Sequence, residues 1–96
     1  MKLTSQESDL TGMWQLRLGT AVADATCKRI EWLIANHLVQ LGADASGWSE
    51  LYRDPEDGRL WELTWPQAEI HGGGPPRLTF ITADVARSRY GAVVDG

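Results

Sequence analysis

The sequence predicts an α+β domain: a small, mainly antiparallel sheet covered by one long helix, with a short C-terminal helix, in two layers. Two observations indicate this class. Apolar residues recur at helical spacing between Asp24 and Leu41, and alternating segments flank a turn-forming cluster further on. A chain of 96 residues has room for one modest core, so a single domain over 1–96 is expected.

The first predicted elements are a strand and the long helix. Alternation over 13–18 indicates a half-buried strand that ends before Gly19. The helix is expected from about Asp24, a suitable N-cap, to Leu41, because Gly42 is a typical stop signal. Trp32 falls on the polar side of this helix and has two interpretations: an anchor that contacts a partner, or a residue that covers the edge of the sheet. The apolar stripe of the helix consists of Cys27, Ile30, Ile34, Leu38 and Leu41.

The second half of the chain predicts a hairpin, a strand and a short helix. Segments 47–54 and 58–65 flank the letters DPEDG, which are typical of a turn. A further strand is expected at 77–81, and the short helix is capped by Thr82 and ends at Gly91. Three tryptophans are expected in the core: Trp14, Trp48 and Trp61.

Charge and composition narrow the classes of partner and compartment. The net charge of -4 disfavours nonspecific binding to nucleic acid or to an anionic membrane. A single cysteine offers no internal disulfide, and the N-terminus has no apolar run typical of a secretory signal. A cytoplasmic monomer is therefore expected, with loose ends at 1–9 and 92–96.

The segment EIHGGGPPRL, residues 69–78, has two interpretations. A His-Gly-Gly-Gly run resembles oxyanion loops, so a small hydrolase or transferase that uses His71 is one alternative. That chemistry needs a nucleophile on a Gly-x-Ser-x-Gly elbow, which the sequence lacks. Pro75 and Pro76 also remove backbone donors that an anion would need. A loop built for a defined shape is the preferred interpretation.

Other chemistry-bearing residues also favour a protein without an active site. Cys27 could pair with His37 or His71 as nucleophile and base, but its place on the apolar stripe indicates an inert side chain. One cysteine and two distant histidines do not have the spacing of a zinc site, so neither a metal nor a cofactor is expected. Three carboxylates could serve acid–base chemistry, but the solvated side of a sheet is their expected place: Glu50, Glu62 and Glu69.

Three segments resemble the immunity protein 27 family of bacterial polymorphic toxin systems. They are CKRIEWLIANHL, GWSELYRDPEDGRLWELTWPQAEIHGGGPPRLTFI and the closing RYG. The family pattern orders Leu-Thr-Gly-x-Trp, RIEWL and GRxWELTxPQxExHGGGPPxL, and the likeness runs from about Leu10 to Gly91. One departure is Leu60-Trp61, where the family pattern has an aromatic pair.

The resemblance implies an immunity protein that binds a cognate toxin in the cytoplasm of the producing cell. Such a protein is not an enzyme and blocks the active site of the toxin or an adjacent surface. A structural subunit of a larger assembly is a third interpretation, for which a large exposed apolar patch is expected.

The function implied by the resemblance suggests a set of toxin-contacting residues. Acidic residues outnumber Arg53 and Arg59 between residues 44 and 69, so this stretch is expected to steer a basic toxin, such as a nuclease. Asp44 and Glu50 belong to this acidic stretch. Aromatic anchors and the glycine loop complete the expected contacts. The candidate toxin-binding residues are Tyr52, Asp54, Glu56, Asp57, Glu62, Trp65, Glu69, His71 and Gly73.

Overall fold

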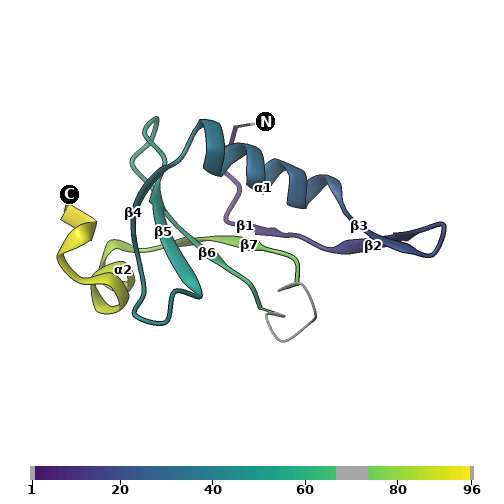
Figure 1. Cartoon of the computed structure of the whole chain (residues 1–96). Coiled ribbons are helices and arrows are strands. Elements are labelled where there is room, and N and C mark those ends of the chain that lie inside the picture. Colours follow the sequence, from purple (N-terminus) through teal and green to yellow (C-terminus); the bar gives the residue numbers. More distant parts are fainter. Residues whose placement is uncertain (1, 67–73, 96) are drawn as a thin grey trace.

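A computed structural model describes residues 2–66 and 74–95. Along the chain the elements are β1 (Asp9–Thr11), β2 (Trp14–Arg17), β3 (Thr20–Ala23), α1 (Ala25–Asn36), β4 (Val39–Ala43), β5 (Ser49–Arg53), β6 (Leu60–Thr64), β7 (Arg77–Ile81), α2 (Ala83–Tyr90) and the 3-10 helix η1 (Gly91–Asp95). Figure 1 shows α1 along the sheet.

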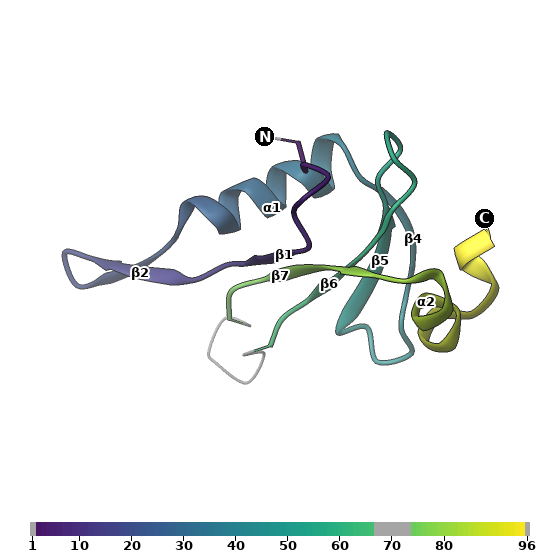
Figure 2. The same ribbon diagram turned by 180° about the vertical axis from the view of Figure 1, so that it is seen from behind.

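The main sheet has five strands in the order β1-β7-β6-β5-β4, and each neighbouring pair is antiparallel. Strands β2 and β3 form a separate hairpin. Figure 2 shows this hairpin projecting from one end of the molecule, with α2 at the other end. The predicted α+β class and the antiparallel sheet are confirmed.

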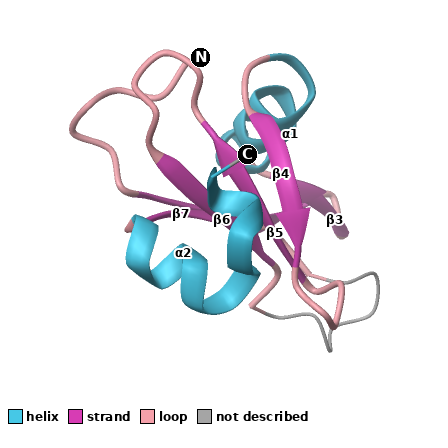
Figure 3. Ribbon diagram, turned by 90° about the vertical axis from the view of Figure 1, so that its left-hand side faces the viewer, coloured by secondary structure: helices cyan, strands magenta, loops and turns pink. Residues whose placement is uncertain are grey.

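Side chains alternate between the two faces of the sheet, so each face has its own core. Tyr52 and Trp61, paired across β5 and β6, belong to the cluster beneath α1. Their neighbours Leu51 and Leu60 point the other way and pack with Ala86 and Val94. Helix α2 and η1 therefore cover part of the second face (Figure 3), in addition to the helix and sheet layers that the sequence predicted.

Helix α1 begins as predicted and ends earlier. The Asp24 carboxylate accepts the backbone N–H of Cys27 at 2.8 Å, which confirms the N-cap. The helix stops at Asn36, so the expected extension to Leu41 is wrong. Residues 39–43 form β4 instead: Leu41 packs from this strand against the second cluster, and Leu38 is buried just before the strand begins. Among the described helices, none has the length and apolar character to cross a membrane.

Leu3 and Val94, near the two ends of the described chain, are buried, whereas the sequence predicted loose ends at 1–9 and 92–96. Leu3 is 8% exposed and Val94 is 4% exposed. Gly42 explains the approach of η1 to β4, because a Cβ there would lie 3.2 Å from Cγ2 of Val93. This glycine therefore allows close packing and does not end a helix.

The hairpin and the C-terminal helix follow the predictions closely. Strands β5 and β6 flank the turn, and β7 occupies the expected 77–81. Thr82 accepts the backbone N–H of Val85 at 3.3 Å through its hydroxyl oxygen, and Gly91 ends α2 with a φ of 74°.

Candidate functional site

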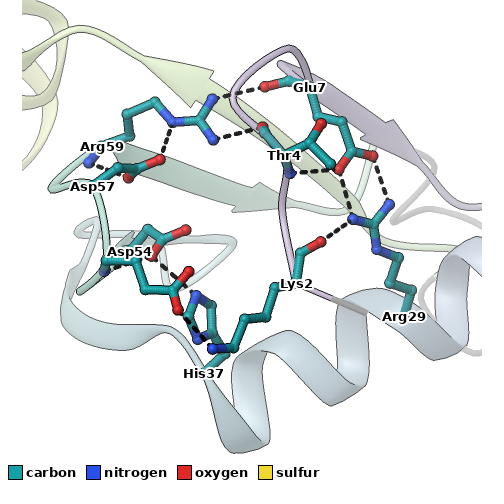
Figure 4. A network of polar contacts seen from close by, with 9 residues as sticks. Lys2, Thr4, Glu7, Arg29, His37, Asp54, Asp57 and Arg59 are labelled. Atoms are coloured by element: carbon teal, nitrogen blue, oxygen red, sulfur yellow. Dashed lines mark hydrogen bonds and ion pairs between the residues drawn. The ribbon is translucent and has the colours of Figure 1, made fainter.

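A polar network, called here the polar joint, ties the N-terminal segment to one side of α1 and to the β5–β6 turn (Figure 4). Arg29 donates from both terminal nitrogens to the Glu7 carboxylate, each at 2.6 Å. This hydrogen bonding lowers the pKa of Glu7 to about 2. The members of the joint are Lys2, Thr4, Glu7, Arg29, His37, Asp54, Glu56, Asp57 and Arg59.

Asp54 organises the turn end of the polar joint. Its side chain is buried, and Oδ1 lies 3.0 Å from Nε2 of His37 and accepts the backbone N–H of Glu56 at 2.9 Å. Its backbone carbonyl accepts the N–H of Gly58 at 2.8 Å. The polar atoms of Asp54 are therefore used inside the chain, and this predicted contact residue is a structural one in the fold.

His37, Asp54 and Glu56 bring three ligand-type atoms within 4.8 Å of one another. All three atoms already have partners, because the Lys2 ammonium lies 2.6 Å from Oε1 of Glu56. The nearby ammonium and its hydrogen bond lower the pKa of Glu56. The cluster joins the N-terminus to the turn through contacts within the chain.

The acidic stretch predicted to steer a toxin is partly neutralised by basic side chains, some of which come from distant parts of the chain. Asp57 pairs with Arg59 at 2.7 Å, and Glu62 pairs with Arg89 of α2. Lys2 and Arg89 lie far from this stretch in sequence, so local counting of charges missed them. Asp44 and Glu50 have no basic partner among the described residues.

Two more predicted contact residues are buried. Tyr52 is 3% exposed and donates its hydroxyl to Glu50 at 2.6 Å. Burial, with this hydrogen bond, raises the pKa of Tyr52. Glu62 is 6% exposed and accepts the hydroxyl of Tyr90, so its expected place on a solvated sheet face is wrong. It lies between the sheet and α2 instead.

The tryptophans divide differently from the prediction. Trp61 is buried, which confirms its place in the core. Trp14 is 38% exposed and Trp48 is 59% exposed, so the expectation that they belong to the core is wrong. Trp65, a predicted anchor, is partly buried and packs against the main core. Trp32 packs there as well, which favours its role as cover for the sheet.

A pocket of about 330 Å³, called here the α1 pocket, lies between α1, the end of β6 and the β2–β3 hairpin. Its lining is Trp14, Ala23, Cys27, Ile30, Glu31, Ile34, Leu63, Trp65, Gly74 and Pro76. These residues come from five separate segments, which sequence reasoning did not bring together. A mostly apolar hollow with one carboxylate suits a binding site for a side chain.

Gly12 lies against Cys27 and Pro76, two residues of the pocket lining, and this close approach explains the glycine in the Leu-Thr-Gly-x-Trp pattern. A Cβ at Gly12 would lie 2.6 Å from Sγ of Cys27 and 2.8 Å from the carbonyl oxygen of Pro76. The Gly12 N–H donates to that same oxygen at 2.8 Å. Cys27 is 1% exposed and its Sγ lies 3.5 Å from the Met13 carbonyl oxygen, so its predicted place on an apolar stripe is confirmed. Burial raises the pKa of the Cys27 thiol.

The described part of the glycine-proline loop begins at Gly74. Gly74 has a φ of 73°, a conformation that favours glycine, and Pro75 is buried behind it. Most of the remaining loop lies outside the described residues, so the interpretation of 69–78 as a loop of defined shape remains a prediction. Glu69, His71 and Gly73 lie outside the described residues, so their predicted contacts remain predictions.

Exposed apolar side chains gather on the projecting hairpin beside the α1 pocket. Met13 is 63% exposed, Val22 is 37% exposed and Leu18 is fully exposed at the tip. Leu18 has a φ of 52°, followed by Gly19 at 80°, so the two residues form a primed-type hairpin turn. Leucine is unusual in this conformation. Its position in the turn places an apolar side chain at the tip of the hairpin.

Comparison with known proteins gives a family for the chain. The family model for immunity protein 27 matches residues 17–82, which include α1, the main hairpin and all of β7. No curated protein and no solved structure gives a significant match. Because the matched region covers more than half of the 96 residues, the chain belongs to the immunity protein 27 family.

Proposed function

We propose that the chain binds a cognate bacterial toxin and keeps it inactive in the cytoplasm of the cell that produces both. The family match over residues 17–82 carries this proposal. The toxin domain is held in a complex whose interface covers its active site or an adjacent surface. No chemical step by the immunity protein is needed for this effect.

Two features support a binding role. Exposed apolar side chains cluster on the β2–β3 hairpin, and such patches on small domains mark interaction sites. The polar side chains that looked catalytic in sequence are engaged within the fold: Cys27 contacts Met13, and His37 contacts Asp54. The net charge of -4 favours a basic toxin, and a nuclease is the proposed class.

The test is co-expression with the toxin domain encoded beside this chain. We expect cells that carry both to grow and cells that carry the toxin alone to die. A matched control is Trp61→Ala, which removes the buried core tryptophan and is expected to lose protection together with folding, at a cost of about 3–5 kcal/mol. Cell death despite soluble wild-type protein would contradict the proposal.

A further inference from the structure

The α1 pocket combines an apolar interior with a polar rim. Cys27 and Ile30 of α1 are buried at its base, and Leu63 of β6 is 3% exposed. Glu31 lies at the rim with its side chain exposed. An aliphatic chain can lie on this base while a polar head reaches the carboxylate.

Glu31 differs from the other described carboxylates, because it makes no hydrogen bond or ion pair inside the described chain. The other acidic side chains that the structure describes, those between residues 7 and 84 except Glu69, are used by the fold: they pair with basic residues, cap α1, support the β4–β5 turn or accept a tyrosine hydroxyl. Lys28, one turn before Glu31, forms no ion pair with it. The carboxylate at the pocket rim is therefore available to a partner.

The walls of the pocket favour a cation. Trp14 and Trp65 line it together with Glu31, and indole faces attract guanidinium and ammonium groups. A purely apolar occupant would desolvate Glu31 without replacing its hydrogen bonds to water, and an acidic one would be repelled. A basic side chain satisfies the carboxylate and the apolar base at once.

We infer that the α1 pocket receives an arginine or lysine side chain of the toxin, with Glu31 as its ion-pair partner and the β2–β3 hairpin packing beside it. This inference rests on the proposed function and adds to it the contact surface and the chemistry of the partner. It moves the expected contact away from the acidic hairpin, whose charges are mostly paired within the chain.

The experiment measures the affinity of purified variants for the neighbouring toxin domain, disabled in its catalysis, by calorimetry. We expect Glu31→Gln to weaken binding about tenfold and Glu31→Arg about a hundredfold, since a desolvated charge pair is lost or reversed. Asp84→Asn and Asp84→Arg are the matched controls, because Asp84 is 97% exposed on α2 and holds only a 3.6 Å contact with Arg87. Their affinities are expected to stay within about twofold of wild type.

A charge exchange identifies the partner residue. Exposed basic residues of the toxin are changed to glutamate one at a time, and the residue that meets Glu31 is recognised because Glu31→Arg restores its binding. If Glu31→Arg binds as tightly as Asp84→Arg, or if no toxin variant is rescued, the inference is wrong while the proposed function stands. If the wild-type chain does not bind the toxin at all, the proposed function fails and the inference fails with it.

Discussion

The two sides of α1 carry opposite kinds of chemistry. Arg29 and Glu31 are two residues apart and therefore point to nearly opposite sides of the helix. On the Arg29 side, ion pairs and buried hydrogen bonds hold the N-terminal segment and the β5–β6 turn. On the Glu31 side, an apolar pocket opens beside exposed tryptophan and an unpaired carboxylate. Charge that is satisfied within the fold stabilises it, and charge left unsatisfied at a pocket is available for binding.

The largest effect on the polar joint is expected from Asp54→Ala. This change removes the acceptor of the Glu56 N–H and the partner of His37 in a buried place. We expect the free energy of unfolding to fall by about 3 kcal/mol, measured by chemical denaturation. Asp57→Ala, at a more exposed ion pair, is the control and is expected to cost about 1 kcal/mol. Equal losses in the two variants would contradict the role given to Asp54.

The pocket side is tested by Gly12→Ala. The added Cβ meets Sγ of Cys27 and a backbone oxygen of Pro76, so we expect a loss of about 2 kcal/mol in the free energy of unfolding. The double variant with Cys27→Ala relieves one of the two clashes, and a double-mutant cycle should show favourable coupling. A Gly12→Ala protein as stable as wild type would show that the chain does not approach so closely there.

A smaller, pH-dependent effect is expected from Glu7→Gln. The pKa of Glu7 is about 2 in the fold and about 4.3 in an unfolded chain. Its ionised form therefore stabilises the fold fully above about pH 4.5, and this contribution disappears as the pH falls towards 2. We expect Glu7→Gln to cost on the order of 1–2 kcal/mol at pH 7.

The measurement is the free energy of unfolding of both proteins between pH 7 and pH 2, where the two curves are expected to converge. Glu31→Gln is the matched control on the other side of α1, and a change of less than about 0.5 kcal/mol at pH 7 is expected for it. A gap between wild type and Glu7→Gln that stays constant down to pH 2 would exclude the ion pair with Arg29 as its source.

The smallest expected effect concerns the hairpin tip. Asparagine tolerates the backbone conformation of Leu18 better than leucine does, so Leu18→Asn is expected to stabilise the fold by about 0.5 kcal/mol. Leu18→Val, which is β-branched, should destabilise it by a similar amount. Thermal denaturation shifted in opposite directions by the two variants would confirm the turn; shifts in the same direction would not.

Local signals in the sequence predicted the parts of the fold that depend on neighbouring residues. The Asp24 and Thr82 caps, the turn before Gly58 and the strand at 77–81 all follow from short-range patterns. Strand β4 was missed because Leu38 and Leu41 continue a helical spacing although the helix ends at Asn36.

The candidate site depends on contacts between distant residues, which a local pattern does not contain. Lys2 reaches Glu56 and Arg89 reaches Glu62, so the acidic stretch is less charged in space than in sequence. Glu31 carries no distinguishing signal in the sequence, because an exposed glutamate on a helix is ordinary. Its place at a candidate binding pocket depends on Trp14, a residue of another segment that lines the same pocket.

Hydrogen exchange of the chain with and without its toxin compares the two sides of α1 in one measurement. The account predicts slower exchange on complex formation over residues 13–34, which contain the hairpin and the pocket side of α1, and no change over residues 54–60 of the polar joint. Protection confined to the β5–β6 turn, with the hairpin unchanged, would contradict it.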